Sequence, residues 1–170
     1  MGTWTGAWLD SLYGVCKAYG TNTLSYNVNS GSGSAPPSVS PISTSPVVKT
    51  STAYTGTRAG FTFSGWNTAA NGTGTNYPVN TDISVTVATT LYAQWNSTIT
   101  YDGNNNDGGS VPSATTAFSS AAVTQLATNT GSLTRTGYTF AGWNTSANGT
   151  GTSYAAGLAT YASSGDTTLY

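Results

Sequence analysis

The chain has 170 residues, of which only four are basic and five are acidic, with no His, no Glu and a formal net charge of −1. Soluble domains usually carry about 25% charged residues, so Ser, Thr, Asn and Gly must supply most of this surface. Such a sparse charge set gives no electrostatic footprint for nucleic acid and few groups for acid–base catalysis. We therefore predict a protein that is not an enzyme, needs no cofactor and has no catalytic, cofactor-binding or metal-binding residues.

The chain is nevertheless predicted to fold. It contains five Trp, eleven Tyr and four Phe, whereas disordered segments are poor in aromatic residues. No stretch approaches the roughly 20 apolar residues of a membrane helix, and residues 1–18 lack the pattern of a signal peptide. The uncharged polar surface is interpreted as that of an extracellular or cell-surface protein.

Residues 1–18 are predicted to be an N-terminal tail, either a donor strand or the end of a preceding repeat. The tail ends in Leu-Tyr, a pair that recurs at 91–92 and at 169–170. Its single Cys16 excludes an internal disulfide framework; a buried thiol is favoured over a lipid anchor or an intersubunit disulfide. Contacts between subunits are predicted for the apolar side chains of the tail, which are Trp4, Trp8, Leu9, Leu12 and Val15.

Residues 19–95 are predicted to form a first repeat. A short strand is expected at 23–29, and the following segment, 30–46, is rich in Ser, Gly and Pro. Pro36 and Pro37 exclude a central strand there, because Pro cannot donate to a sheet ladder. A last strand is expected at 90–95.

The second half of the repeat carries the strongest signal. Residues 58–77 read RAGFTFSGWNTAANGTGTNY and residues 135–154 read RTGYTFAGWNTSANGTGTSY, identical at 15 of 20 positions. Alternating aromatic and polar residues predict a strand at 61–63 and at 138–140. Gly65 and Gly142 indicate a bulge or a close backbone approach beside the following Trp. Asn-Gly at 71–72 and 148–149 predicts type I′ turns, with the far strands beginning near Tyr77 and Tyr154.

Residues 96–170 are predicted to form a second repeat that lacks its last strand, because the sequence stops before a counterpart of 93–95. A strand is expected at 98–104. At 117–127 a short helix competes with a strand, and the β-branched Val123 and Thr124 favour the strand. The run from Asp102 to Gly108 has oxygen ligands at alternate positions, as calcium loops do. Ser113 stands where a bidentate Glu would be needed, so a plain polar turn is favoured.

The repeated aromatic and Leu residues are predicted to form one core per repeat, since a unit of this size needs its large side chains inside. The alternative use of exposed aromatics is a platform for a sugar or a receptor. The predicted structural core consists of Phe63, Trp66, Tyr77, Leu91, Tyr92, Phe140, Trp143, Tyr154, Leu169 and Tyr170.

The pattern R-[TA]-G-[YF]-T-F-x-G-W-N-T-x-A-N-G-T-G-T-x-Y followed by T-T-L-Y-A-Q-W resembles the Listeria–Bacteroides repeat, also called the internalin B-repeat-like module. The resemblance covers about residues 20–170. It implies two tandem small β-grasp-like units of about 77 residues, mostly β with little or no helix, on microbial surface proteins with adhesive or spacer roles.

The function expected from these observations is that of a non-catalytic extracellular repeat protein. It would act as a structural stalk, a filament subunit or an adhesin segment of a microbial cell surface. The expected partners are further copies, through head-to-tail self-association or a continued tandem array, and possible host or carbohydrate ligands. The alternative is a carbohydrate- or receptor-binding module that uses exposed aromatics.

Overall fold

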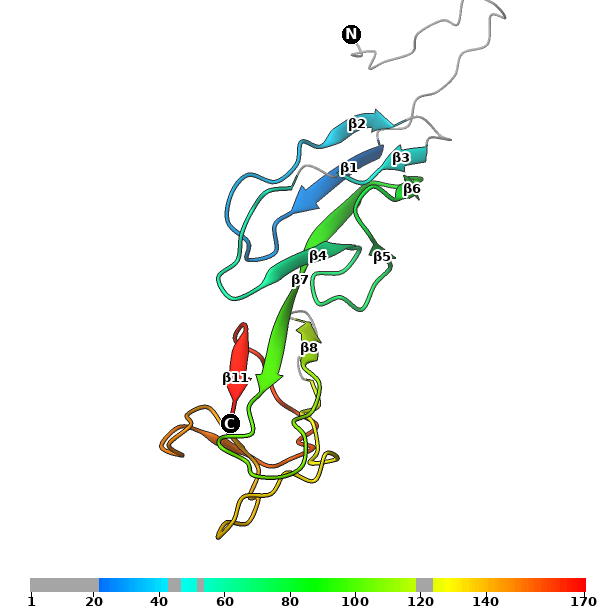
Figure 1. Ribbon diagram of the computed structural model, residues 1–170. Helices are drawn as coiled ribbons and strands as arrows, with labels where there is room; N and C mark the ends of the chain where they lie inside the picture. Colours follow the sequence, from blue (N-terminus) through cyan, green and yellow to red (C-terminus); the bar gives the residue numbers. More distant parts are fainter. Residues whose placement is uncertain (1–21, 43–46, 52–53, 119–123) are drawn as a thin grey trace, which may run out of the picture. The chain divides into compact units, whose positions relative to one another are not determined.

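The computed structural model describes residues 22–42, 47–51, 54–118 and 124–170, which contain strands and no helix (Figure 1). The prediction of a mostly β chain is therefore confirmed. By their contacts the described residues divide into two compact units: unit 1, up to Gly56 and at Gly65–Ala93, and unit 2, at Thr57–Ser64 and Gln94–Tyr170. The strands are β1 (Asn22–Asn27), β2 (Val39–Ile42), β3 (Val47–Lys49), β4 (Thr62–Asn67), β5 (Asn76–Tyr77), β6 (Asp82–Ser84), β7 (Thr89–Tyr101), β8 (Thr115–Phe118), β9 (Trp143–Asn144), β10 (Ser153–Tyr154) and β11 (Thr167–Leu169).

Unit 1 is built around β1. This strand pairs antiparallel with β2 and parallel with the first part of β7, where Leu24 lies opposite Thr89. β2 is the edge of the sheet, which fits the Pro residues in and before it because an edge strand can spare an N–H. β4 and β5 form a hairpin in which Trp66 faces Tyr77, and β3 and β6 form a separate two-stranded sheet.

Unit 2 repeats this arrangement with different strands. The last part of β7 pairs parallel with β11, so that Ile99 lies opposite Thr167, and antiparallel with β8. β9 and β10 form the hairpin, with Trp143 opposite Tyr154. The two strands predicted at 90–95 and 98–104 are thus a single strand of 13 residues, β7. The strand predicted at 138–140 is wrong, since β9 begins only at Trp143.

In each unit a buried Trp and a Tyr both hydrogen-bond to the backbone of one and the same residue. In unit 1 the Trp66 indole N–H donates to the Ser51 carbonyl at 3.4 Å, and the Ser51 N–H donates to the Tyr26 hydroxyl at 3.2 Å. The two rings lie 4.8 Å apart, edge to face. Burial raises the pKa of Tyr26 despite this hydrogen bond. The polar end of each large aromatic is therefore satisfied inside the core.

The predicted core residues differ in burial. Trp66, Leu91, Trp143 and Leu169 are at most 1% exposed, and the other six are partly buried. Sequence reasoning missed several buried side chains. These are Leu24, Trp95, Ile99, Tyr101, Leu126 and Tyr161.

The predicted type I′ turns are wrong, because only the Gly of each Asn-Gly pair has a positive φ, at 74° for Gly72 and for Gly149. Gly72 N–H instead bonds back to the Ala69 carbonyl at 3.0 Å. The loop is held from inside by Asn67, whose amide donates to the Gly72 and Gly74 carbonyls at 3.2 Å. The buried amide thus fixes a longer loop than a two-residue turn.

The close approach predicted at the repeated Gly is present, but its partner is not the indole. Gly65 and Gly142 both have φ 132°. A Cβ at Gly142 would lie 2.4 Å from the Tyr154 carbonyl oxygen, and one at Gly65 would lie 3.1 Å from that of Tyr77. The main chain of the opposite hairpin strand therefore occupies the space.

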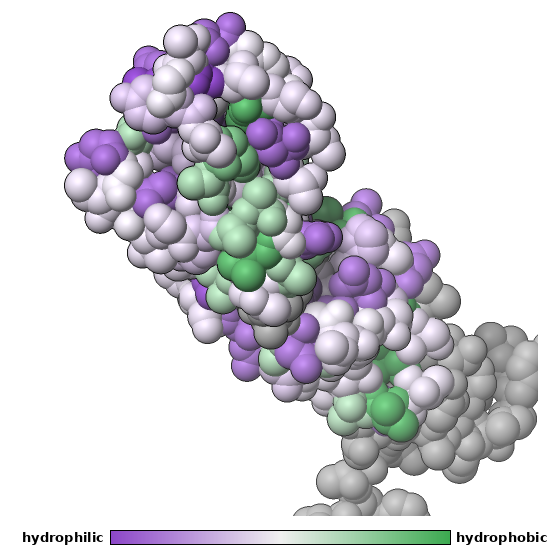
Figure 2. Space-filling model, turned by 90° about the horizontal axis from the view of Figure 1, so that it is seen from below, coloured by the Kyte–Doolittle hydropathy of each residue, from purple (hydrophilic) through white to green (hydrophobic). Residues whose placement is uncertain are grey.

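In the stretch where helix and strand competed, β8 covers Thr115–Phe118 and Thr124 bridges to Tyr161; residues 119–123 lie outside the described ranges. The structure does not confirm the finer β-grasp-like assignment. The last strand that the structure describes in the second repeat is β11, at Thr167–Leu169. The space-filling view shows a face of mostly intermediate hydropathy with small apolar patches (Figure 2), as the scarcity of charge predicts.

Candidate functional site

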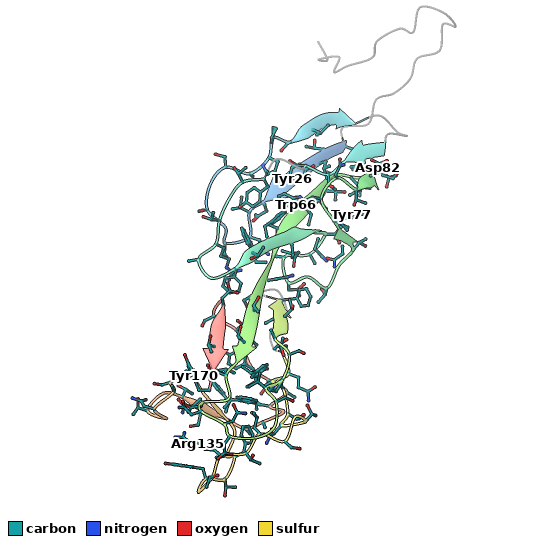
Figure 3. All side chains as sticks on the ribbon, in the orientation of Figure 1. Tyr26, Trp66, Tyr77, Asp82, Arg135 and Tyr170 are labelled. Atoms are coloured by element: carbon teal, nitrogen blue, oxygen red, sulfur yellow. The ribbon has the colours of Figure 1, made fainter. Side chains whose placement is uncertain are left out.

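The candidate site is a cavity of about 180 Å³ in unit 2. Its floor is apolar, formed by Leu133, Phe140 and Trp143, while Arg135 and Tyr170, both labelled in Figure 3, also line it. The Phe140 and Trp143 rings meet edge to face at 5.3 Å, and Trp143 is 1% exposed. The floor is therefore an extension of the core of unit 2.

A β-turn at residues 135–138 forms one wall of the cavity. The Tyr138 N–H donates to the Arg135 carbonyl at 2.9 Å, and Gly137 has φ 81°, a value that the third position of a type II turn requires. The Arg135 guanidinium lies 4.5 Å from the centre of the Tyr138 ring. Tyr138 is 70% exposed, so the wall offers an aromatic face and a cation to a ligand.

Polar residues from the segment after β7 form a second wall of the cavity. Asp102 accepts the Asn104 N–H at 2.7 Å. The Asn104 side chain donates to the Ala147 carbonyl at 2.7 Å, and the Arg135 guanidinium donates to the Asn104 carbonyl at 3.1 Å. The Asp102 carboxylate and the Asn104 carbonyl thus accept hydrogen bonds from the chain's own donors.

The carboxyl of Asp107, the residue after the lining residue Asn106, accepts hydrogen bonds from Thr136. Hydrogen bonds from the Thr136 side chain and backbone N–H lower the pKa of the Asp107 carboxyl. The described ranges contain no group of three or more His, Cys, Asp or Glu side chains placed to hold a metal ion. The lining of the cavity thus combines aromatic rings, one guanidinium group and polar groups.

The turn at the cavity occurs a second time in unit 2, at residues 58–61. The Phe61 N–H donates to the Arg58 carbonyl at 2.9 Å, and the Arg58 guanidinium lies 4.2 Å from the Phe61 ring centre. The Gly60 carbonyl accepts the Asp166 N–H at 2.7 Å. The turn at residues 58–61 is therefore hydrogen-bonded to Asp166, just before β11.

The residues proposed for intersubunit contacts, Trp4 to Val15, lie outside the described ranges, as does Cys16. Of the described aromatics, Phe118 and Tyr138 are the large exposed ones, at 49% and 70%. Sequence reasoning did not single out Arg135 or Tyr138. The signal that could have found them is the repeated R-x-G-aromatic string, since Gly at the third position of a turn brings the first and fourth residues together.

A family model described as the Listeria-Bacteroides repeat domain matches the chain twice, at residues 23–94 and 98–170. The chain belongs to the Listeria–Bacteroides repeat domain family. The resemblance seen in the sequence is thereby confirmed, with two repeats in tandem.

Two relatives of this Listeria–Bacteroides repeat chain come from Evansella cellulosilytica. One, named "Putative Gly-rich membrane protein", is 40% identical over 108 residues, which is 59% of this chain and 12% of the relative. The other, named "Putative membrane protein", is 44% identical over 85 residues, 48% of this chain and 12% of the relative. The match thus spans about an eighth of each relative's length. No solved structure matches, and the described residues contain no helix long and apolar enough to span a membrane.

Proposed function

We propose that the chain is a non-catalytic, extracellular part of a microbial surface protein, in which it acts as a structural stalk, filament subunit or adhesin segment. The main support for the proposal is that the same core arrangement occurs in both units. Unit 2 repeats the Trp–residue–Tyr arrangement of unit 1 with Trp143, Ala127 and Tyr101. Repeat proteins are stabilised by such units and by their nearest-neighbour contacts.

The names of the two relatives support a location at the cell surface, since both are called membrane proteins. The uncharged polar composition agrees with that location. The test is to label intact cells that make the full-length protein with an antibody against this chain. Labelling without permeabilisation supports a surface location, and labelling only after permeabilisation contradicts it.

Self-association is the second part of the proposal. We propose that copies associate head to tail or that the repeat continues in a longer array, because a heterologous contact can propagate. Electron microscopy and sedimentation of the purified chain measure this directly. Deleting residues 1–18 tests the tail as a donor: polymers that disappear while the monomer stays folded support donation, and an unchanged monomer before and after deletion contradicts it.

A binding module for a sugar or receptor is the other function class. The exposed ring of Tyr138, with Arg135 over it at the rim of the cavity, favours it. A glycan-array screen of the purified chain, with Tyr138→Ala as the matched variant, tests this class. Binding that the substitution abolishes would support it.

A further inference from the structure

In each repeat the first described strand lies parallel beside the last described strand. In the first repeat, residues 24–27 of β1 pair with residues 89–92 of β7. In the second repeat, residues 99–101 of β7 pair with residues 167–169 of β11, and the arrows of β7 and β11 point the same way in Figure 1. We call these two strand pairs the first clamp and the second clamp. β7 therefore takes part in both.

Tension along the chain loads each clamp in shear. A pull on the chain before the first strand draws that strand toward its amino end, and a pull after the last strand draws the last strand toward its carboxyl end. Because the two strands are parallel neighbours, they are pulled in opposite directions along one axis. The hydrogen bonds of a parallel ladder are evenly spaced, so they share the load and must break together. An antiparallel hairpin such as β9–β10, pulled apart at its open end, loses its bonds one after another.

A buried pair of side chains opposes sliding in both clamps. Leu91 lies opposite Tyr26 in the first clamp, and Leu169 lies opposite Tyr101 in the second. Both leucines are 0% exposed, and Tyr101 is 4% exposed. A slip by one residue turns every side chain of a strand to the other face of the sheet, so it would move the leucine out of the core. Sliding therefore costs burial as well as hydrogen bonds.

Side chains reinforce the first clamp at both ends of its ladder. The Asn22 side-chain amide donates to the Thr86 carbonyl at 2.7 Å, before the paired positions. The Asn29 side-chain amide donates to the Ala93 carbonyl at 2.8 Å, after them. The connection between the two segments thus extends beyond the ladder in both directions.

The second clamp is reinforced at both ends by other groups. The Thr98 N–H donates to the Asp166 carboxylate at 2.7 Å, before the paired positions. The Asp102 N–H donates to the Leu169 carbonyl at 2.7 Å, at the far end. The two clamps therefore share one design, although different residues complete it.

We propose that each repeat is a tension-bearing unit, in which the clamp keeps the repeat folded when the chain is pulled from its two ends. The chain passes from the first clamp to the second within β7 itself, so load reaches the second clamp along a covalent strand. The use of this resistance in the cell rests on the proposed role as a surface stalk or adhesin segment. The resistance itself is a property of the purified chain.

The test is single-molecule force spectroscopy of the full chain in two pulling geometries, because forced unfolding depends on the unfolding rate. One variant serves both: Cys16→Ser with Thr100→Cys and Thr168→Cys, two exposed positions that lie opposite each other in the second clamp. Handles are attached either to tags at the two chain ends or to the two thiols. Pulling from the ends is expected to rupture either unit at a force several times higher than pulling across the thiols, which peels β7 and β11 apart. Rupture across the thiols is recognised by the chain released between them, roughly 240 Å.

A second comparison asks whether the bonds of the clamp carry the load. Asp166→Ala removes the exposed acceptor of the Thr98 N–H, so it is expected to lower the rupture force of unit 2 when the chain is pulled from its ends. Thr150→Ala is the matched control, because it removes one exposed side-chain hydrogen bond, to Asn148 at 2.7 Å, outside the clamp. This control is expected to rupture at the force of the parent chain.

Equal rupture forces in the two pulling geometries would overturn the proposal, as would equal forces for Asp166→Ala and Thr150→Ala pulled from the ends. These outcomes are distinct from a failure of the proposed function. A protein that is absent from the cell surface would contradict that function and would leave the measured forces unchanged.

Discussion

The indole N–H of Trp143 donates to the main-chain carbonyl of Ala127 at 2.8 Å. The Ala127 N–H in turn donates to the Tyr101 hydroxyl at 2.8 Å, and the Tyr101 and Trp143 rings lie 4.6 Å apart. The segment that carries Ala127 is thus bound to β7 and to β9 by side chains from two different strands. The same geometry in unit 1 uses Ser51, Tyr26 and Trp66.

Replacing Trp143 by Ala is expected to destabilise unit 2 by about 3–5 kcal/mol, as deletion of a large buried aromatic usually does. Trp143→Phe keeps a ring and removes one of the two donors to the Ala127 carbonyl, which still accepts the Gly157 N–H at 3.2 Å; the expected loss is that of one hydrogen bond, about 0.5–1.5 kcal/mol. Urea denaturation followed by circular dichroism measures both. Tyr138→Ala is the control, because that ring is 70% exposed. If Tyr138→Ala lowered the free energy of unfolding as much as Trp143→Ala, burial would not explain the effect of the Trp143 substitution.

Gly142→Ala is expected to be far more costly than Gly137→Ala. Both positions have positive φ, at 132° and 81°, so both substitutions strain the backbone by about 1–3 kcal/mol. Only at Gly142 would the new Cβ meet an atom, the Tyr154 carbonyl oxygen; nothing lies within 4 Å of a Cβ at Gly137. Thermal melts of the two variants give the comparison, and equal midpoints would contradict this account of the hairpin.

The sequence predicts the parts of the fold that recur inside each repeat. Identical Gly-Trp pairs identify Trp66 and Trp143, and repeated Leu-Tyr pairs identify Leu91 and Leu169; all four side chains are buried. The continuous β7 escapes prediction because Asn96 and Ser97 resemble a polar linker. Ser97 is 2% exposed and hydrogen-bonds to Ser163 at 2.6 Å. That partner lies 66 residues away, so no local pattern can reveal that the serine is a strand residue.

The cavity is less predictable than the core. The repeated R-x-G-aromatic string predicts a turn, but it does not indicate that Arg135 stacks on Tyr138 or donates to Asn104. The contact with Asn104, whose φ is 49°, joins two residues that are 31 positions apart in the sequence. A single sequence carries too little information about such long-range contacts.

Added calcium or EDTA is expected to leave the melting temperature of the chain unchanged. The alternate oxygens of the segment from Asp102 to Gly108 already serve as internal acceptors: Asp102 binds the Asn104 N–H, and the Gly108 carbonyl binds the Asn106 side chain at 3.0 Å. A cation would have to compete with the Arg135 guanidinium for this wall. Differential scanning calorimetry with millimolar calcium, compared with EDTA and with magnesium, would contradict the prediction if only calcium raised the midpoint.

Acid is expected to destabilise unit 2 through Asp107. Hydrogen bonds from Thr136 lower the pKa of this carboxyl in the folded chain, so the charged form contributes stability above the unfolded-state pKa, about 3.9. That contribution is lost as the pH falls through the lower folded-state pKa, because the protonated carboxyl is a weaker acceptor. Asp107→Asn is expected to reduce the loss of stability as the pH falls below the unfolded-state pKa of about 3.9, while leaving the fold intact, since the group is exposed. Urea midpoints at a series of pH values measure this; Asp82→Asn, which removes an exposed carboxyl from unit 1, is the matched control. Parallel pH curves for the parent chain and Asp107→Asn would exclude Asp107 as the source of the acid sensitivity.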